Sequence, residues 1–163
     1  MEIIWSQAVL AGLLGAALMA LAMFAGKIMG LASDMVKVIG LFFFPPESSR
    51  VLIYGVGLGV HFLVGAGFGI VYAVLFTGVG TQMLIGPSAM WGILFGALHG
   101  VAIGSLAGLL PAVHPRMGTG PSAVLQAPGF FGRNIGLGMP TALILLHIIY
   151  GVTAGIVYAG AFY

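Results

Sequence analysis

Residues 61–73 read HFLVGAGFGIVYA, and residues 147–159 read HIIYGVTAGIVYA. Both segments follow the pattern H-x3-G-x3-G-I-V-Y-A, so a histidine opens each of two otherwise apolar phrases. A shift of 86 residues (147 minus 61) superimposes the phrases without a gap and also places Trp5 on Trp91. Matching His, Tyr and Trp residues in one register are uncommon in apolar sequence, so we predict two related halves.

The composition of the chain identifies the environment of these phrases. The 163 residues are 61% hydrophobic and 5% charged, with a mean hydropathy of +1.20, whereas soluble domains carry about 25% charged residues. Apolar stretches of about 20 residues cross the roughly 30 Å hydrocarbon core as helices. Four such stretches are present, at about 5–26, 51–76, 90–112 and 138–161. The sequence therefore predicts an all-α integral membrane protein with four transmembrane helices in a single domain, 1–163.

The repeat divides the predicted helices into two hairpins, over 1–80 and 86–163. Each hairpin begins and ends on the same side of the membrane, so we expect a parallel repeat, related by an axis near the membrane normal. The second and fourth helices are then equivalent, and His61 and His147 lie at matching depth. Convergent low complexity is the alternative explanation of the match.

The basic residues indicate how the chain is oriented. All five occur in the segments that join the first helix to the second and the third to the fourth: Lys27, Lys37, Arg50, Arg116 and Arg133. Because short cytoplasmic loops are enriched in Lys and Arg, both loops are predicted to face the cytoplasm and both termini to lie outside. A bacterial inner membrane is the expected location. The net charge of +2 is too small to indicate a nucleic-acid partner.

The first apolar stretch is not expected to be a cleaved signal. Met1-Glu2 supplies no positive region, and no cleavage site of small residues ends the stretch before Lys27. We therefore expect a helix of the mature protein.

Both loops on the basic side contain apolar sequence. In the first loop, Ser33 and Asp34 are candidate caps of a short amphipathic helix whose apolar residues are Met35, Val38, Ile39 and Phe42. We expect this helix to lie in the membrane interface, with Lys37 toward the headgroups. The second loop is rich in proline and contains Phe130-Phe131, so it is predicted to be irregular and to pack against the bundle or a partner.

Small residues recur four positions apart in the predicted helices. Residues with this spacing share one helix face, and a face without side chains lets another backbone approach closely. We therefore predict that the following glycines pack helix against helix: Gly57, Gly65, Gly69, Gly92, Gly96, Gly100, Gly104, Gly108, Gly151 and Gly155.

Three histidines lie inside predicted spans, where ionisable residues are costly and indicate functional sites. His61 and His147 are candidate axial ligands of haem b or of another ring cofactor or pigment, and His99 is the third candidate. Alternatively, each neutral imidazole only hydrogen-bonds to a neighbouring helix. No metal site is predicted, because zinc or copper would need a third ligand and all three acidic residues lie outside the spans.

The repeated phrase also predicts which way its residues face. The histidine, both glycines and the tyrosine fall at i, i+4, i+8 and i+11, on one helix face. We expect this face to point into the bundle or toward a partner, with Tyr72 and Tyr158 in the aromatic belt at the outer surface.

Several motifs together resemble a known family. They are the D-x-x-K-x-I-G loop at 34–40, the H-F-L-V-G helix, the G-F-F-G-x-N loop at 129–134 and the closing H-I-I-Y-G-V helix. The chain resembles an uncharacterised family of small bacterial four-helix membrane proteins that is known as a domain of unknown function. The resemblance implies the four-helix fold and no activity.

The sequence favours a structural role over catalysis. It contains no G-x-S-x-G, Walker or H-E-x-x-H motif and no carboxylate in a span, so we do not expect an enzyme. The leading hypothesis is a non-catalytic subunit that stabilises a larger membrane complex of respiratory or photosynthetic type, in contact with lipids and other integral membrane subunits. The alternatives are a haem- or pigment-binding subunit for electron transfer or light harvesting, and a small oligomeric channel or transporter.

Overall fold

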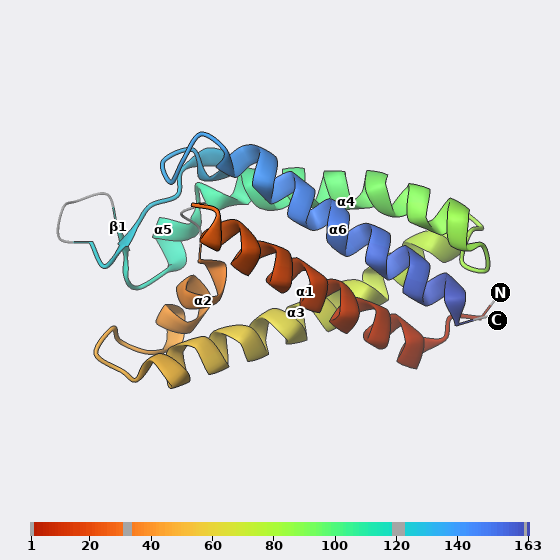
Figure 1. Cartoon of the computed structure of the whole chain (residues 1–163), viewed down its shortest axis with the longest axis horizontal. Coiled ribbons are helices and arrows are strands. Elements are labelled where there is room, and N and C mark those ends of the chain that lie inside the picture. Colours follow the sequence, from red (N-terminus) through yellow and green to blue (C-terminus); the bar gives the residue numbers. More distant parts are fainter. Residues whose placement is uncertain (1, 31–33, 119–122, 162) are drawn as a thin grey trace.

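The fold is a bundle of four long helices with an elaborated end (Figure 1). A computed structural model describes residues 2–30, 34–118, 123–161 and 163. Its elements are α1 (Trp5–Ile28), α2 (Met35–Phe43), α3 (Arg50–Gly78), α4 (Ile85–Ala107), α5 (Leu110–Val113), β1 (Met117–Gly118), β2 (Leu125–Gln126), the 3-10 turn η1 (Phe130–Gly132) and α6 (Met139–Gly160). Among them α1, α3, α4 and α6 are long and apolar enough to cross a membrane. The prediction of a helical chain with four such helices is confirmed.

The third long helix, α4, differs most from its predicted bounds. It begins at Ile85 rather than near residue 90 and ends at Ala107 rather than near 112. Pro87 lies in the first turn of α4. The backbone N–H groups of a first turn have no carbonyl partner within the helix, so proline is tolerated there. The end of α4 is followed closely by Pro111, which lies in the first turn of the separate short helix α5.

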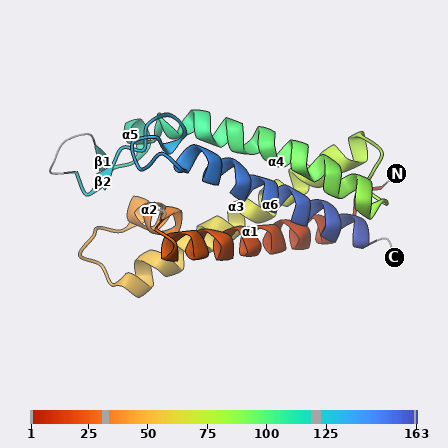
Figure 2. The same cartoon turned by 45° about the horizontal axis from the view of Figure 1, so that its top comes forward.

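The helices run back and forth between two ends of the bundle. The N-terminus, the C-terminus and the α3–α4 turn lie at one end, and α2, α5, β1 and β2 lie at the other (Figures 1 and 2). We call these the terminal end and the loop end. All five basic residues belong to elements or connections at the loop end. This arrangement is compatible with a multi-pass membrane protein.

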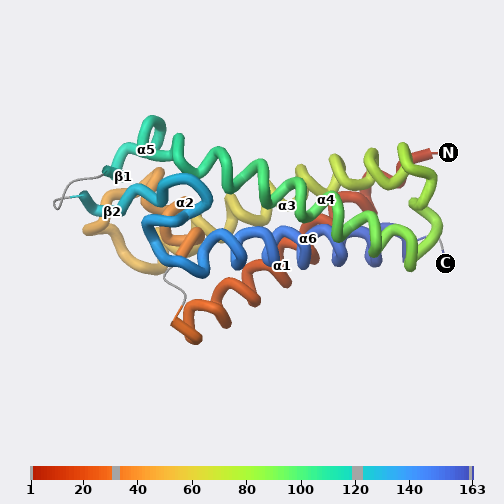
Figure 3. Tube along the Cα trace, turned by 90° about the horizontal axis from the view of Figure 1, so that it is seen from above, coloured from red at the N-terminus to blue at the C-terminus, as the bar shows by residue number. Residues whose placement is uncertain are grey.

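The four long helices pack in the spatial order α3, α1, α6, α4. Helix α1 packs on α3, α4 packs on α6, and the two pairs meet through α1 and α6. The α1 and α6 helices diverge toward the loop end (Figures 2 and 3). A two-fold axis between the pairs would pack α3 on α4 as closely as α1 on α6, but that second contact is much smaller in the described residues. The duplication stays a prediction.

Within each pair, glycines allow the backbones to touch. A Cβ at Gly12 of α1 would overlap the backbones of Gly65 and Gly69 of α3, and Gly92 of α4 and Gly151 of α6 would collide in the same way. Further glycines meet backbone of a neighbouring helix: Gly57 meets Val36, Gly96 meets His147, Gly100 meets Ile144 and Gly155 meets Ser88. Close backbone approach of this kind is what holds helices together where the surroundings are apolar.

Two of the predicted packing glycines have other neighbours. A Cβ at Gly104 would strike the ring of Phe131 in η1, and one at Gly108 would make only ordinary contact with the backbone of Phe130 at 3.6 Å. The glycines of α4 extend beyond the end of α6 that begins at Met139, and η1 lies next to them there. The loop turn therefore covers the last two positions.

The tyrosines of the repeated phrase lie inside the bundle. Tyr72 is 2% exposed and Tyr158 is 1% exposed, and both pack with Phe76, Tyr150 and Ala residues of α1. The predicted place in an aromatic belt is therefore wrong. The spacing that puts each tyrosine on the glycine face also turns it toward a neighbouring helix, where polar partners satisfy its hydroxyl group: the Tyr158 oxygen accepts from the Ile4 N–H at 3.3 Å.

Helix α2 begins where the sequence predicts but packs through a different face. The Asp34 carboxylate accepts from the Lys37 N–H at 3.1 Å and caps the helix; Ser33 lies outside the described residues. The buried positions are Val36, Gly40 and Leu41, because Gly40 lets α2 lie directly on the α3 backbone at Ile53. The predicted apolar face at 35, 38, 39 and 42 stays only partly covered.

The second loop is more ordered than predicted and clamps α2. It contains α5, the parallel pair β1–β2 and η1. The His114 Nε2–H donates to the Val38 carbonyl at 2.9 Å, and Arg116 donates to the carbonyls of Leu41 at 2.6 Å and Phe42 at 3.2 Å. These carbonyls lie in the last turns of α2, so Arg116 satisfies groups that a helix end leaves open. The clamp joins α2 to the second loop at the loop end.

Candidate functional site: a histidine-lined cavity in the bundle

The structure brings the three histidines of the spans to one cavity. His61 of α3, His99 of α4 and His147 of α6 all line a space of about 200 Å³. Its other walls come from the second half of α1, from α2 and from the first half of α6. The cavity therefore lies in the half of the bundle where α1 and α6 diverge (Figure 3).

Most of the cavity wall is apolar and deformable. Four methionines contribute to it: Met19, Met23, Met35 and Met139. Methionine side chains are flexible and polarizable, so such a wall adapts to the shape of a ligand and makes favourable contacts with aromatic rings. Sequence reasoning missed these residues, although Met19 and Met23 are four positions apart and so share a helix face with each other.

The backbone fixes the tautomer of two of the imidazoles. His147 Nδ1 lies 2.7 Å from the Leu143 carbonyl oxygen, and His61 Nε2 lies 3.1 Å from that of Ala16. A carbonyl oxygen only accepts hydrogen bonds, so the bonded nitrogen carries the proton in each ring. In the neutral rings, His147 Nε2 and His61 Nδ1 then hold lone pairs and can accept a hydrogen bond.

His99 is held between an aromatic ring and a hydroxyl group. Its ring lies 4.0 Å from that of Phe68 and its Nδ1 lies 3.4 Å from the Tyr72 hydroxyl oxygen. Among the described residues, no other acceptor forms a hydrogen bond with that hydroxyl group. We therefore assign its proton to the bond with Nδ1, which leaves the His99 proton on Nε2. The centroids of the His99 and His147 rings are 4.6 Å apart and the rings are nearly perpendicular, at 69°.

Tyr150 closes the cavity toward the terminal end. Its hydroxyl donates to the Gly65 carbonyl at 2.6 Å, so α6 is tied to α3 across the bundle. A Cβ at Gly15 would lie 2.9 Å from the Tyr150 ring, which shows that glycine in α1 makes room for it. The glycines therefore shape the cavity as well as the helix contacts.

The geometry does not fit a haem between His61 and His147. His147 Nδ1 is bonded to a backbone carbonyl, as in many axial ligands, which leaves its Nε2 open. In His61 the Nε2 atom itself is bonded to the Ala16 carbonyl. A space of about 200 Å³ is also below the roughly 300–1,000 Å³ of pockets that hold larger ligands. For metals, no three His, Asp or Glu side chains within residues 2–30, 34–118 and 123–161 are grouped to hold an ion.

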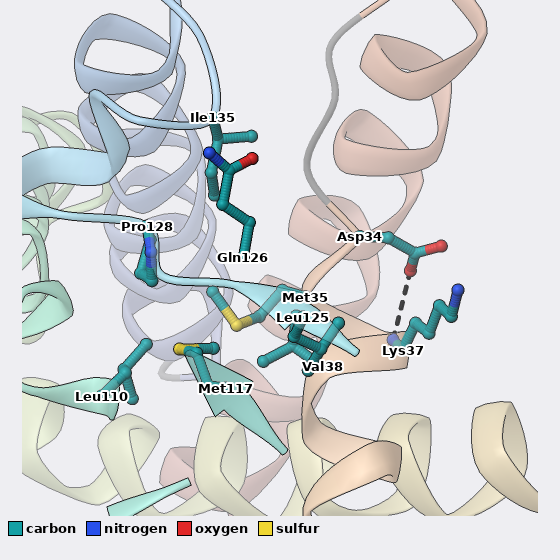
Figure 4. A pocket seen from close by; sticks show the side chains of 10 residues that line it. All are labelled: Asp34, Met35, Lys37, Val38, Leu110, Met117, Leu125, Gln126, Pro128 and Ile135. Carbon is teal, nitrogen blue, oxygen red and sulfur yellow. Dashed lines mark hydrogen bonds between the residues drawn. The ribbon is translucent and has the colours of Figure 1, made fainter. Parts of the chain in front are cut away.

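A second cavity, of about 270 Å³, lies at the loop end between α2 and the second loop (Figure 4). Asp34 and Lys37 stand on one side of it, and Gln126, Pro128 and Ile135 stand on the other (Figure 4). Asp34 also pairs with Lys27 and accepts from the Tyr54 hydroxyl at 2.6 Å. Of the polar side chains that line this cavity, Asp34 is therefore engaged within the chain.

The Asp34 carboxylate holds the ends of three helices together. Partial burial disfavours its charge, but hydrogen bonds from Lys27, from the Tyr54 hydroxyl and from the Lys37 N–H outweigh burial and lower the pKa of Asp34 below its ordinary value. The carboxylate is therefore ionised near neutral pH. Its partners belong to α1, α2 and α3, so its role is structural.

Comparisons with known proteins give no match to this chain, whether with family models, with curated proteins or with solved structures. What the protein does is therefore inferred from its own residues.

Proposed function

We propose that the protein is a non-catalytic integral membrane subunit that packs into a larger membrane complex and stabilises it. The observation that carries this proposal is the outer face of α3. Gly55, Gly59 and Gly67 lie four or eight residues apart on that face, and a Cβ at any of them would meet no atom within 4 Å. Glycines such as Gly12 and Gly92 lie against the backbone of a neighbouring helix, whereas these three positions of α3 are left uncovered.

The outer faces of the neighbouring helices are different. Helix α1 presents large side chains outward at Leu10, Leu14, Leu18 and Leu21, and α4 presents Leu94, Leu98 and Val101. Such side chains suit contact with lipid chains, whereas small residues four apart are typical of contacts between helices in membranes. On α3 the outward glycines are separated by Leu63, which is 73% exposed. We infer that a helix of another integral membrane chain lies along this face.

Substitution on the outer face tests the proposal. Gly59→Leu and Gly67→Leu place side chains where this chain has open space, so the isolated protein is expected to keep its helicity and melting temperature. The same variants are expected to lose co-purifying membrane chains, because the bulk keeps a partner backbone away. Leu98→Ala on α4 is the control and should keep them. Retention of every partner by both glycine variants would contradict the proposal, and loss of a second copy only would favour the oligomeric channel.

We further propose a location in a bacterial inner membrane, with the loop end in the cytoplasm and both termini outside. The gathering of all five Lys and Arg residues at the loop end supports this orientation. The chain is proposed to contact lipids through its large outward side chains.

A further inference from the structure

The histidine-lined cavity has unused hydrogen-bonding atoms. Within the described residues, the His99 and His147 rings each make one hydrogen bond, through Nδ1. The fully buried side-chain atoms without a hydrogen-bond partner do not include either Nε2 atom. Both rings line the cavity, so both Nε2 atoms are accessible to a ligand there. Polar atoms left in this state in an apolar wall are costly unless something in the cavity bonds to them.

The two nitrogen atoms offer opposite roles to a ligand. His147 Nε2 is an acceptor, because the Leu143 carbonyl fixes the proton on Nδ1. His99 Nε2 is a donor, because its Nδ1 accepts from Tyr72. The ring centroids are 4.6 Å apart, so the two rings are neighbours in the cavity wall. A hydroxyl group is the simplest group that donates and accepts through the same oxygen.

The size and lining of the cavity restrict the rest of the ligand. An apolar cavity of about 150 Å³ accommodates benzene, so a space of about 200 Å³ holds one six-membered ring with a small substituent. Methionine thioethers and the Phe68 ring surround that space and favour an aromatic occupant. A larger macrocycle does not fit.

The route to the cavity is lateral. Helices α3 and α4 make few contacts with each other, and Val64 of α3 lines the cavity and is 51% exposed. A ligand that enters here comes from the apolar surroundings of the helices, so it is soluble in lipid. From these observations we propose that the cavity binds a lipid-soluble, hydroxylated six-membered ring of phenol or hydroquinone type, whose hydroxyl bridges His99 and His147.

A matched series of ring compounds tests this proposal on the whole protein in lipid nanodiscs. The probes are 4-fluorophenol, 4-fluoroanisole and 4-fluorotoluene, which both donate and accept, only accept, or do neither. Fluorine NMR titration is expected to show one site that prefers 4-fluorophenol over 4-fluorotoluene by about tenfold, the value of one net hydrogen bond. Empty nanodiscs give the partition into lipid that is subtracted.

Two variants locate the site, and Leu145→Ala, on the outer face of the same helix as His147, is the control. His147→Leu is expected to bind 4-fluorophenol and 4-fluoroanisole about equally, because only the acceptor is lost and the His99 donor remains. Val64→Phe fills the cavity without removing a hydrogen bond and is expected to weaken all three by at least tenfold. If His147→Leu does not fold, the titrations of the wild type and of Val64→Phe with the same three compounds test the proposal. Absence of a preference for 4-fluorophenol over 4-fluorotoluene in the wild type would overturn the proposal. So would survival of a preference for 4-fluorophenol over 4-fluoroanisole in a folded His147→Leu variant, or undiminished binding of all three compounds in Val64→Phe.

Discussion

At the scale of single residues, backbone carbonyls decide what the histidines can do. The Leu143, Ala16 and Val38 carbonyls each bind one ring nitrogen, of His147, His61 and His114 respectively. Only the first partner was predictable, because Leu143 is four residues before His147 in the same helix. The other two carbonyls come from different elements, and their positions follow from glycine packing between helices.

Asp34 gives a prediction about stability and pH. Asp34→Ala removes the cap of α2 and the pair with Lys27, so we expect the free energy of unfolding to fall by about 1 kcal/mol at pH 7. Because folding lowers the pKa of Asp34, its contribution is complete above the unfolded value of about 3.9 and is lost as the pH falls through the lower folded value. Denaturant unfolding of both proteins between pH 7 and pH 3 measures this difference.

The matched control for Asp34 is Lys37→Ala. Lys37 contributes to the cap through its backbone N–H, and its side chain is exposed, so the change should stay within about 0.5 kcal/mol. A loss of stability in Asp34→Ala that does not shrink toward acid pH would show that the carboxylate charge is not what stabilises the cap.

At the scale of elements, glycine faces determine which helices pair. The sequence predicted these faces because a spacing of four is unambiguous on a helix. It misplaced Tyr72 and Tyr158, because the same spacing applies to a tyrosine in an aromatic belt and to one inside a bundle. The sequence also provided no indication of the packing face of α2. That face is set by Gly40, which lies against the α3 backbone, and not by the larger apolar residues, because close backbone contact requires the absence of a side chain.

Two alanine substitutions in α4 separate packing from helix propensity. Gly92→Ala would push a Cβ into the Gly151 backbone, so we expect a loss of about 1–3 kcal/mol in stability from overpacking. Gly86→Ala meets no atom within 4 Å and is expected to leave stability unchanged or slightly raised, because alanine favours helix more than glycine does. Thermal unfolding followed by circular dichroism compares them. Equal melting temperatures would mean that α4 does not lie against α6 at Gly92.

At the scale of the whole molecule, hydropathy alone predicted the four long helices, because each must be apolar over a length set by its surroundings. The convergence of His61, His99 and His147 on one cavity required the packing order of the helices, which the sequence does not encode locally. The predicted repeat would have placed α3 against α4 as closely as α1 against α6, but the contact there is much smaller. The clamp by His114 and Arg116 had no signal beyond the apolar character of the loop.

The orientation of the molecule can be measured with reporters. We expect a fusion after Tyr163 to be active with a reporter that works only outside the cytoplasm, and one inserted after Ser48 in the α2–α3 connection to be active only inside, because the basic residues gather at the loop end. Activity of both fusions on the same side would contradict the arrangement of termini and loops in Figure 1.

The central claim is that the outer face of α3 lies against another integral membrane chain, and crosslinking in the native membrane tests it most directly. A photoreactive amino acid replaces Leu63 on that face, and in a second protein it replaces Leu98 on the outer face of α4; both side chains are well exposed. After illumination, mass spectrometry identifies what each position has captured. The account predicts a specific membrane polypeptide other than this chain at position 63 and lipid alone at position 98. Lipid alone at both positions would contradict it.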